Sequence, residues 1–444
     1  MVPAASAAEK VDLEVRFDKN DQHRIAMKLE HHGKVVIDGA GQDEVQTLPM
    51  DTVARLGYYQ RYTGNASDRQ AIRYYDKSKG IYKISKGDTS ATLADNNRLI
   101  VARVKSKPGK RIQLASVEAT LKQAEFELLR NPADPLSLPS LLNRDDVSVG
   151  QTWKPGDDGL ANFLAVDRII RNNIQIKLKE IKNNVARIYI TGKLRASVDD
   201  VTTDMDVVSL VLVDLKSRQV TTVRLKIREI RQPGQVAPGF DGESNIDMRV
   251  ARNNKCSQLS NEALAKATRS RVIEQRFRWE SPEGQFLLTY DPRWRVIAAE
   301  DEAAVFRYLK NGLLLAQCNV VQLPSRPADN PLTLSEYKRE VFKIVEADPK
   351  AKIVEATEFK TDENAYALRV HVAGEEEGVD VSRVYYHVSS IDGRRLTFVF
   401  TLEDDVRKLF RPADEMMVNS VKFFPVAGRK APAKTAAEKT STRR

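Results

Sequence analysis

The sequence predicts a mostly β N-terminal part, an antiparallel meander that curls into a barrel or half-barrel, followed by a C-terminal α+β sandwich. Three observations lead to this fold class. Short segments that alternate apolar and polar residues recur between residues 11 and 250, and such alternation is typical of half-buried strands. Clusters of Gly, Asn and Asp separate these segments. Between residues 277 and 425, one capped amphipathic helix stands among strand-like segments.

The length of the chain requires more than one hydrophobic core. A chain of 444 residues is expected to form two or three domains of ordinary size. We expect a β-rich domain in two halves over 11–250, with two domains that share an edge as the alternative. An α+β domain follows over 277–425. The remaining segments are expected to be an export remnant or disordered start, a linker and a disordered basic tail: 1–10, 251–276 and 426–444.

Strands are expected throughout the first hundred residues. Their period-two pattern places apolar side chains on one face, which is buried, and polar side chains on the other, which is exposed to solvent. Several short strands at this spacing favour a curled meander. The expected strands are 11–17, 24–30, 52–63, 71–76, 80–85 and 99–104.

One helix is expected to interrupt these strands. Ser116 is a suitable N-cap residue, and Asn131-Pro132 ends the helical pattern. Residues 134–142 are expected to form a loop or short turn. The apolar stripe of the helix is expected at Val117, Leu121, Ala124 and Leu128.

A second β-rich stretch is expected from about residue 149 to 250. Val213–Arg224 has the pattern of a hairpin, with its polar turn at Lys216–Gln219. The long strands expected here are 174–181, 185–194, 205–215 and 220–230.

The region 277–425 shows a complete helix signature. Thr333 caps a helix over 333–347, Glu336 closes the capping box, and Leu332 can pack on Tyr337 as a hydrophobic staple. Its inward stripe is expected to be Leu334, Tyr337, Val341, Ile344 and Val345. Around this helix we expect two short strands about a turn at 282–284, strands at 313–323, 352–359, 365–373, 379–389 and 395–402, and a last helix that starts at Pro412.

The net charge of +10 is distributed unevenly. Residues 1–276 carry +10, residues 277–427 carry −5, and the tail from Gly428 onward carries +5. The folded part shows no stripe of Lys and Arg interleaved with aromatic residues, so specific nucleic-acid binding is not predicted. The tail is expected to touch anionic surfaces weakly. No segment approaches the ~18 apolar residues of a membrane span.

The beginning of the chain contains a possible export signal remnant. Ala5-Ser6-Ala7 followed by Ala8 fits a small-residue cleavage site, although the preceding charged and apolar regions are absent. A secreted or periplasmic location is therefore expected, with a cytoplasmic one as the alternative.

Five histidines are the first candidates for metal ligands. His31 and His32 are adjacent, so in a strand they point to opposite faces. In the hairpin expected around 375–378, His371 would lie opposite Arg383 and His387 opposite Ala367. The two rings would then be about 13 Å apart, too far to share one ion. Both histidines are expected to face solvent.

The two cysteines cannot form a thiolate metal cage. A bridge between Cys256 and Cys318 would stabilise the fold by roughly 4 kcal/mol through chain entropy. Two free thiols are favoured over this bridge. In that case Cys318 is a small core residue, and Cys256 is exposed.

Other polar clusters have simple structural explanations. Asp199-Asp200 with Asp204 and Asp206, and the run 375–377, could attract calcium, but acidic residues in turns are usually solvated. One tyrosine of each adjacent pair is expected in the core and the other on the surface; the pairs are Tyr58-Tyr59, Tyr74-Tyr75 and Tyr385-Tyr386. Asn65-Ala66-Ser67 is a glycosylation sequon only in a host that glycosylates.

Sequence motifs for catalysis are absent from the chain. It contains no nucleophile elbow, no zinc-protease helix motif, no phosphate-binding loop and no calcium loop, and Gly39-Ala40-Gly41 lacks the third glycine of a dinucleotide site. The sequence therefore predicts no catalytic residues, no cofactor-binding residues and no metal ligands. Catalytic groups that converge only in the fold would escape this test.

The region 277–425 resembles the PsbP-like family, an antiparallel sheet sandwiched by helices. The resemblance rests on Tyr290-Asp291-Pro292-Arg293-Trp294, on the helix LTLSEYKREVFKIV and on the ending FRPADEMMVNSVKF, and it covers roughly a third of the chain. It implies an assembly or binding module without shared catalytic residues. The segments QAIRYYDK (70–77) and VGQTWKPGDDGLANFL (149–164) are similar to uncharacterised secreted proteins of planctomycete-type bacteria, a resemblance that implies no activity.

The function predicted from these observations is a non-catalytic binding or scaffold protein of a bacterial cell envelope. Its partner would be a protein, or a lipid or peptide ligand. The alternatives are a hydrolase-like enzyme with an unrecognised site in the 11–250 region, and a weak binder of anionic surfaces or nucleic acid. An enzyme should gather titratable groups in a concave pocket, whereas a carrier should show an apolar one.

Overall fold

The computed structural model describes residues 10–38, 45–64, 69–104, 111–252, 255–263, 265, 276–281, 285–300, 302–310, 313–410 and 412–424. Several predicted features lie outside these residues: the export remnant, the sequon, Gly39-Ala40-Gly41, the turn at 282–284 and the basic tail. In the described part of the chain, no helix has the length and apolarity that a membrane span needs.

The chain forms two compact units. The first contains residues 1–278, 291–297 and 307–315, and the second contains residues 279–290, 298–306 and 316–444. Strands β18, β19 and β20 contribute residues to both units.

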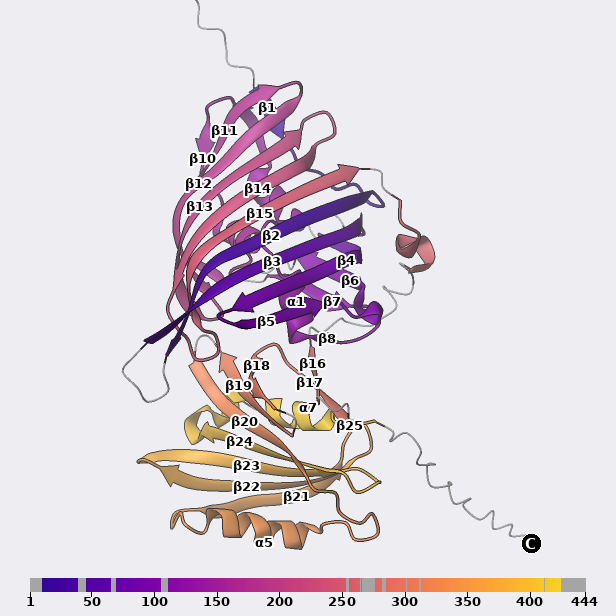
Figure 1. Cartoon of the computed structure of the whole chain (residues 1–444), viewed down its shortest axis with the longest axis vertical. Coiled ribbons are helices and arrows are strands. Elements are labelled where there is room, and N and C mark those ends of the chain that lie inside the picture. Colours follow the sequence, from indigo (N-terminus) through magenta and orange to yellow (C-terminus); the bar gives the residue numbers. More distant parts are fainter. Residues whose placement is uncertain are drawn as a thin grey trace, which may run out of the picture. The chain divides into compact units, whose positions relative to one another are not determined.

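The first unit is built on one curved sheet of twelve strands (Figure 1). Its order is β10-β11-β12-β13-β14-β15-β2-β3-β4-β6-β7, with β5 paired to β4. The pairing of β15 with β2 joins the two halves of the 11–250 region. The strands are β2 (Gln22–Asp38), β3 (Val45–Tyr62), β4 (Gln70–Ile84), β5 (Gly87–Thr92), β6 (Leu99–Val104), β7 (Ile112–Ser116), β10 (Thr152–Trp153), β11 (Arg168–Lys182), β12 (Val185–Val198), β13 (Val201–Asp214), β14 (Gln219–Arg231) and β15 (Gly239–Arg252).

Short elements complete the first unit. Helices α1 and α3 contact the sheet, and α2 contacts α3. Strand β1 pairs with β9, and β8 pairs in parallel with the start of β16. These elements are β1 (Lys10–Leu13), η1 (Asp95–Asn97), β8 (Leu121–Lys122), α1 (Gln123–Leu129), η2 (Pro135–Ser137), α2 (Leu138–Leu142), β9 (Arg144–Ser148), α3 (Asp157–Leu164) and η3 (Ser257–Leu259).

The second unit is centred on a seven-stranded sheet in the order β18-β19-β20-β24-β23-β22-β21. Strand β17 pairs with β25 in a separate small sheet. Its elements are β16 (Phe277–Glu280), β17 (Phe286–Tyr290), β18 (Trp294–Ala299), β19 (Ala303–Lys310), β20 (Leu313–Leu323), α5 (Leu334–Val345), β21 (Lys352–Lys360), β22 (Tyr366–Glu376), β23 (Val379–Ser389), β24 (Arg395–Glu403), η4 (Asp404–Val406), α6 (Arg407–Phe410), α7 (Ala413–Asn419) and β25 (Lys422–Phe423).

The predicted fold class is confirmed: strands dominate the first unit, and the second combines a sheet with helices. No sheet of described strands closes on itself, so the half-barrel alternative fits and the closed barrel does not. The hairpin predicted at 213–224 is present, with Asp214 opposite Gln219.

Several local expectations were wrong. The helix does not start at Ser116, because β7 includes that residue and the backbone NH of Val117 still donates to Leu99 of β6; α1 begins at Gln123. The strands expected at 71–76 and 80–85 form one strand, β4, and the strand expected at 11–17 ends at Leu13.

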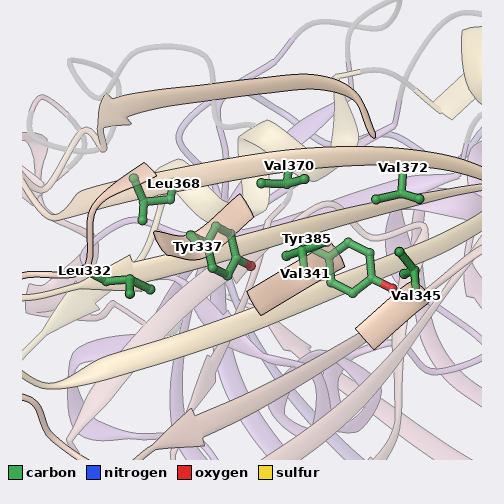
Figure 2. Close-up of a cluster of buried hydrophobic side chains, with 8 residues drawn as sticks. All are labelled: Leu332, Tyr337, Val341, Val345, Leu368, Val370, Val372 and Tyr385. Carbon is green, nitrogen blue, oxygen red and sulfur yellow. The ribbon is translucent and has the colours of Figure 1, made fainter. Parts of the chain in front are cut away.

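Helix α5 packs on the seven-stranded sheet as its sequence predicts (Figure 2). The Thr333–Glu336 capping box is present. Tyr337, Val341 and Val345 are buried against side chains of β22 and β23. Ile344 is the exception, since 66% of it is exposed. It lies about 60° from Val341 around the helix, at the margin of the apolar stripe.

A buried ion pair fixes the segment after α1 to the large sheet. Arg73 of β4 donates both terminal nitrogens to Asp134, at 2.8 and 2.7 Å, and its Nε to Gln60 at 2.6 Å. Asp134 also accepts from the backbone NH of Leu136 and so caps η2. Burial alone would lower the pKa of Arg73, but Asp134 and neighbouring tyrosines hold it above its ordinary value.

The first prediction concerns the core of the second unit. Val341→Asp should destabilise this unit by several kcal/mol, because the aspartate would be a buried charge without a partner. Phe342→Asp is the matched control on the same helix, since 56% of Phe342 is exposed. Urea unfolding of both full-length variants should show a lost or shifted transition for Val341→Asp only. Equal stability of the two variants would contradict the packing of α5.

The second prediction concerns the buried ion pair. Asp134→Ala should cost about 3–5 kcal/mol of unfolding free energy, because Arg73 would stay buried and uncompensated. The control is Asp204→Ala, which removes an exposed pair with Arg195 and should cost about 0–1 kcal/mol. Chemical denaturation of the full chain measures the unfolding free energy of both variants. If Asp134→Ala loses no more stability than the control, the ion pair does not hold the segment after α1 on the sheet.

Candidate functional site

A cavity of about 210 Å³ in the first unit combines arginines with apolar side chains. Its charged residues are Arg111, Arg130, Arg295, Asp134 and Asp167. Its apolar walls include Ile112, Leu114, Phe126, Leu129 and Phe277. The cavity is therefore neither a purely apolar pocket nor an acid–base constellation.

The charged residues of the cavity lie at the ends of elements. Arg111 directly precedes β7, and Arg130 is the C-cap residue of α1. Asp167 lies between α3 and β11, after Ala165 has ended the helix in a left-handed conformation at φ 56°. These three residues are far apart in the sequence, and only the fold brings them together.

Two arginines share the carboxylate of Asp167. Arg111 forms an ion pair with it, and Nη2 of Arg130 lies 3.7 Å from the same oxygen. The other oxygen of Asp167 accepts from the backbone NH of Asp200 at 3.0 Å. Arg130 also donates to the carbonyl of Ala165 at 2.8 Å.

Asp199 forms a second ionic layer beside the cavity. Asp199 and Asp200 both have positive φ and form the two-residue turn between β12 and β13, where Asp is well tolerated. The Asp199 carboxylate lies 3.4 Å from Arg130 and 3.7 Å from Arg231. Burial would raise the pKa of Asp199, but the surrounding guanidinium groups lower it below the ordinary value.

The cations are crowded at this site. Burial, followed by the positive charge of Arg130, lowers the pKa of Arg111, although a guanidinium stays protonated near neutral pH. Glu229, 3.6 Å from Arg231, has a raised pKa because it is buried and lies near Asp199. Burial is the largest cause of both shifts: it raises the pKa of Glu229 and lowers the pKa of Arg111.

Three guanidinium groups and two carboxylates lie on the cavity wall. Each guanidinium has five N–H donors. Asp134 is occupied by Arg73 and Leu136, and Asp167 by Arg111, Arg130 and Asp200. The hydrogen bonds described for Arg295 go to the carbonyls of Pro292 and Trp294. Chemically, the site is suited to holding an oxyanion.

A second cavity, of about 400 Å³, is lined by residues 14–18 and by Tyr62, Gly64, Arg69, Gln70, Leu136, Pro139 and Asn143. Phe17 and Tyr62 stack on its wall with ring centroids 4.1 Å apart. Arg69 donates to the carbonyl of Leu136 at 2.9 Å, and Glu14 is paired with Arg218. Among the described residues, Arg69 is the one arginine at this wall without a carboxylate partner. This second cavity is therefore a weaker candidate for a ligand site than the first.

The expectation that His371 and His387 face solvent was wrong, since both are buried. The strand register is also shifted by one residue: His371 lies opposite Val384, and His387 opposite Leu368. Val384 and His387 are three residues apart, so the two rings lie on opposite faces of the sheet. Both faces of β22 and β23 are covered, which explains the burial. Desolvation lowers the pKa of each histidine to about 4.

His371 belongs to a short polar chain. Its Nε2 lies 3.0 Å from Oγ of Ser382, and this hydroxyl donates to Asp404 at 2.6 Å. The serine stands between the histidine and the aspartate, whereas in a catalytic triad the histidine stands in the middle. This order supports a structural role.

The adjacent histidines of β2 separate as expected. Nδ1 of His31 lies 2.5 Å from Oγ of Ser244, while His32 pairs with Asp51 at 2.7 Å. Burial lowers the pKa of His31 to about 4.

Both cysteines are free thiols. Cys318 is a core residue as predicted. Cys256 is buried rather than exposed, because residues 256–259 pack against Ile72 and Val101 of the large sheet.

The tyrosine pairs only partly follow the expected alternation. Tyr58 and Tyr75 are in the core, while Tyr59 and Tyr74 are half-buried beneath the 256–259 segment. Tyr385 and Tyr386 are both buried, because their sheet is covered on both faces.

The acidic clusters are paired with cations. Asp204 binds Arg195 at 2.8 Å, Asp206 lies 3.5 Å from Lys193, and Glu376 binds Arg383 at 2.8 Å. Glu375 pairs with Lys350. Within the described ranges, no group of three or more His, Cys, Asp and Glu side chains is arranged to hold a metal ion.

The sequence interpretation missed the arginine cavity entirely. No local pattern connects Arg111, Arg130 and Arg295, which are separated by up to 184 positions. The one available signal was the pair Asp199-Asp200, which was considered as a calcium site and lies instead beside guanidinium groups.

The third prediction concerns acid stability. Because the folded-state pKa of Asp199 is lowered, its ionisation stabilises the fold above the unfolded-state pKa of about 3.9, and this stabilisation is lost as the pH falls through the folded-state value. Asp199→Asn should therefore be less stable than the parent at pH 6, and the gap should narrow toward pH 3. Urea titrations across this range measure it. Asp88→Asn, whose carboxylate is exposed, is the control, and a gap independent of pH would contradict the assignment.

Comparisons with known proteins assign no family. No family model matches the chain, and no curated protein matches it. Among solved structures, the chain is similar to cyanobacterial PsbP (CyanoP) from Synechocystis sp. PCC 6803, with 14% identity, 38% of this chain and 98% of that chain covered, and a TM-score of 0.28. It is also similar to a Bacteroides thetaiotaomicron VPI-5482 protein, with 12% identity, 35% and 50% coverage and a TM-score of 0.24. The immunity protein TplEi from Pseudomonas aeruginosa gives 10% identity, 48% and 72% coverage and a TM-score of 0.21. Scores this low carry no functional argument.

Proposed function

We propose that this chain is a non-catalytic binding protein of a bacterial cell envelope, and that the arginine cavity of its first unit is the ligand site. The observation that carries the proposal is the convergence of three guanidinium groups on a partly apolar cavity. Guanidinium groups are the side chains best suited to recognise carboxylate and phosphate groups.

The polar groups at this cavity support binding more than turnover. Arginine stabilises negative charge but neither attacks a substrate nor exchanges a proton near neutral pH. The cavity wall contains no Ser, Cys, His or Lys, and its two carboxylates are engaged in ion pairs. An enzyme would need a nucleophile or a general base at the same place.

The remaining parts of the proposal rest on the sequence. The second unit would act as a PsbP-like docking module, as the motifs of residues 290–294 and of helix α5 imply. The small-residue stretch at 5–8 motivates the secreted or periplasmic location. The resemblance of residues 70–77 and 149–164 motivates the assignment to a planctomycete-type envelope protein.

The fourth prediction tests the site. Full-length protein purified from its host should carry a small anionic adduct in native mass spectrometry, and Arg130→Gln should lose it. Arg187→Gln is the matched control, because Arg187 pairs with Glu180 at 2.6 Å with both side chains half-exposed. Circular dichroism verifies that each variant is folded.

Two results would overturn the proposal. If folded Arg130→Gln and Arg187→Gln retain the same bound mass as the parent, the cavity is not the site. If a substrate screen finds turnover that Arg130→Gln abolishes, the protein is an enzyme, and the non-catalytic assignment fails.

A further inference from the structure

The size of the cavity restricts its ligand. About 210 Å³ is equivalent to about seven water molecules at ~30 Å³ each. Inorganic phosphate, or an acid of the size of benzoate, fits this space. We therefore take small anions and acids of this size as the ligands to test at this cavity.

The apolar walls add a second requirement. Phe126 and Phe277 approach each other with ring centroids 5.0 Å apart, and Leu129 lies on the same wall. A bare, strongly hydrated anion would leave this apolar surface without a partner. A ligand that has both an anionic and a short apolar group satisfies both kinds of wall.

The charged walls determine the ligand's polar group. Arg130 already binds Ala165, Asp167 and Asp199, so its charge is fixed in position before a ligand arrives. Arg111, which precedes β7, forms an ion pair with the same Asp167. One carboxylate thus holds two guanidinium groups close together, and their mutual repulsion is relieved when a second anion enters.

We propose that the cavity binds a small organic oxyanion, a carboxylate or phosphate ester with one short apolar group. Arg111 and Arg130 hold the anionic group, and Phe126, Leu129 and Phe277 enclose the apolar group. This inference rests on the proposed function, since it specifies the ligand class of the same site.

Isothermal titration calorimetry of the full-length protein tests the ligand class with four probes: benzoate, phenyl phosphate, inorganic phosphate and the neutral isostere benzamide. Benzoate or phenyl phosphate should bind about tenfold or more tightly than benzamide and inorganic phosphate, because only they satisfy both walls. The stronger of the two identifies a carboxylate or a phosphate ester. Affinity should fall with added salt.

Variants separate charge from shape. Arg130→Gln and Arg111→Gln should each weaken the best probe about tenfold or more, whereas Arg130→Lys, which keeps the charge but loses the planar fork, should weaken it less. Phe126→Leu should weaken benzoate and leave inorganic phosphate unchanged. Arg187→Gln should behave as the parent does.

The outcomes distinguish the two proposals. If benzamide binds as well as benzoate and only Phe126→Leu weakens it, the oxyanion class is wrong but the cavity remains the ligand site. If inorganic phosphate binds as well as phenyl phosphate, the apolar requirement is wrong. If no probe binds and the host-purified protein keeps its adduct in Arg130→Gln, the ligand class and the proposed site both fail.

Discussion

The first unit depends on the buried ion pair between Arg73 and Asp134. Arg73 is almost fully buried near the start of β4, where its charge would be very costly without a fixed partner. Asp134 supplies that partner with both oxygens, and it also caps η2. The segment after α1 therefore lies against the sheet, and this contact holds Asp134 in the cavity wall beside Arg130.

The outer face of the same sheet shows how charge is normally handled in this protein. Cross-strand partners neutralise one another: Lys193 with Asp206, Lys226 with Glu243, and Arg228 with Asp241. Such pairs keep a long sheet charged without a strong net field. The arginine cavity departs from this rule, because Arg111 and Arg130 share the single carboxylate of Asp167, and Arg295 lines the same cavity. A site that departs from the local pattern of a fold is where function is expected.

The sequence predicted what repeats locally and missed what depends on distant contacts. Strands β11 to β14 and β21 to β24 follow from alternation and turn residues, and α5 follows from its cap and apolar stripe. Strand β15 was missed because Gly239, Gly242 and its acidic residues weaken the pattern, yet it joins both halves of the sheet. His371 and His387 were misplaced because a strand covered on both faces loses the polar alternation that marks solvent exposure. The arginines of the cavity share no local pattern in the sequence, and only the neighbouring pair Asp199-Asp200 stood out there.

The same arrangement explains why an anion site need not be a catalytic one. Aligned guanidinium groups stabilise negative charge, and enzymes use that effect when charge develops in a transition state. Here the positive charge is in place before any ligand arrives, held by Asp167 and Asp199. For a ligand that is already anionic when it binds, this charge stabilises the bound ground state, which gives affinity rather than rate.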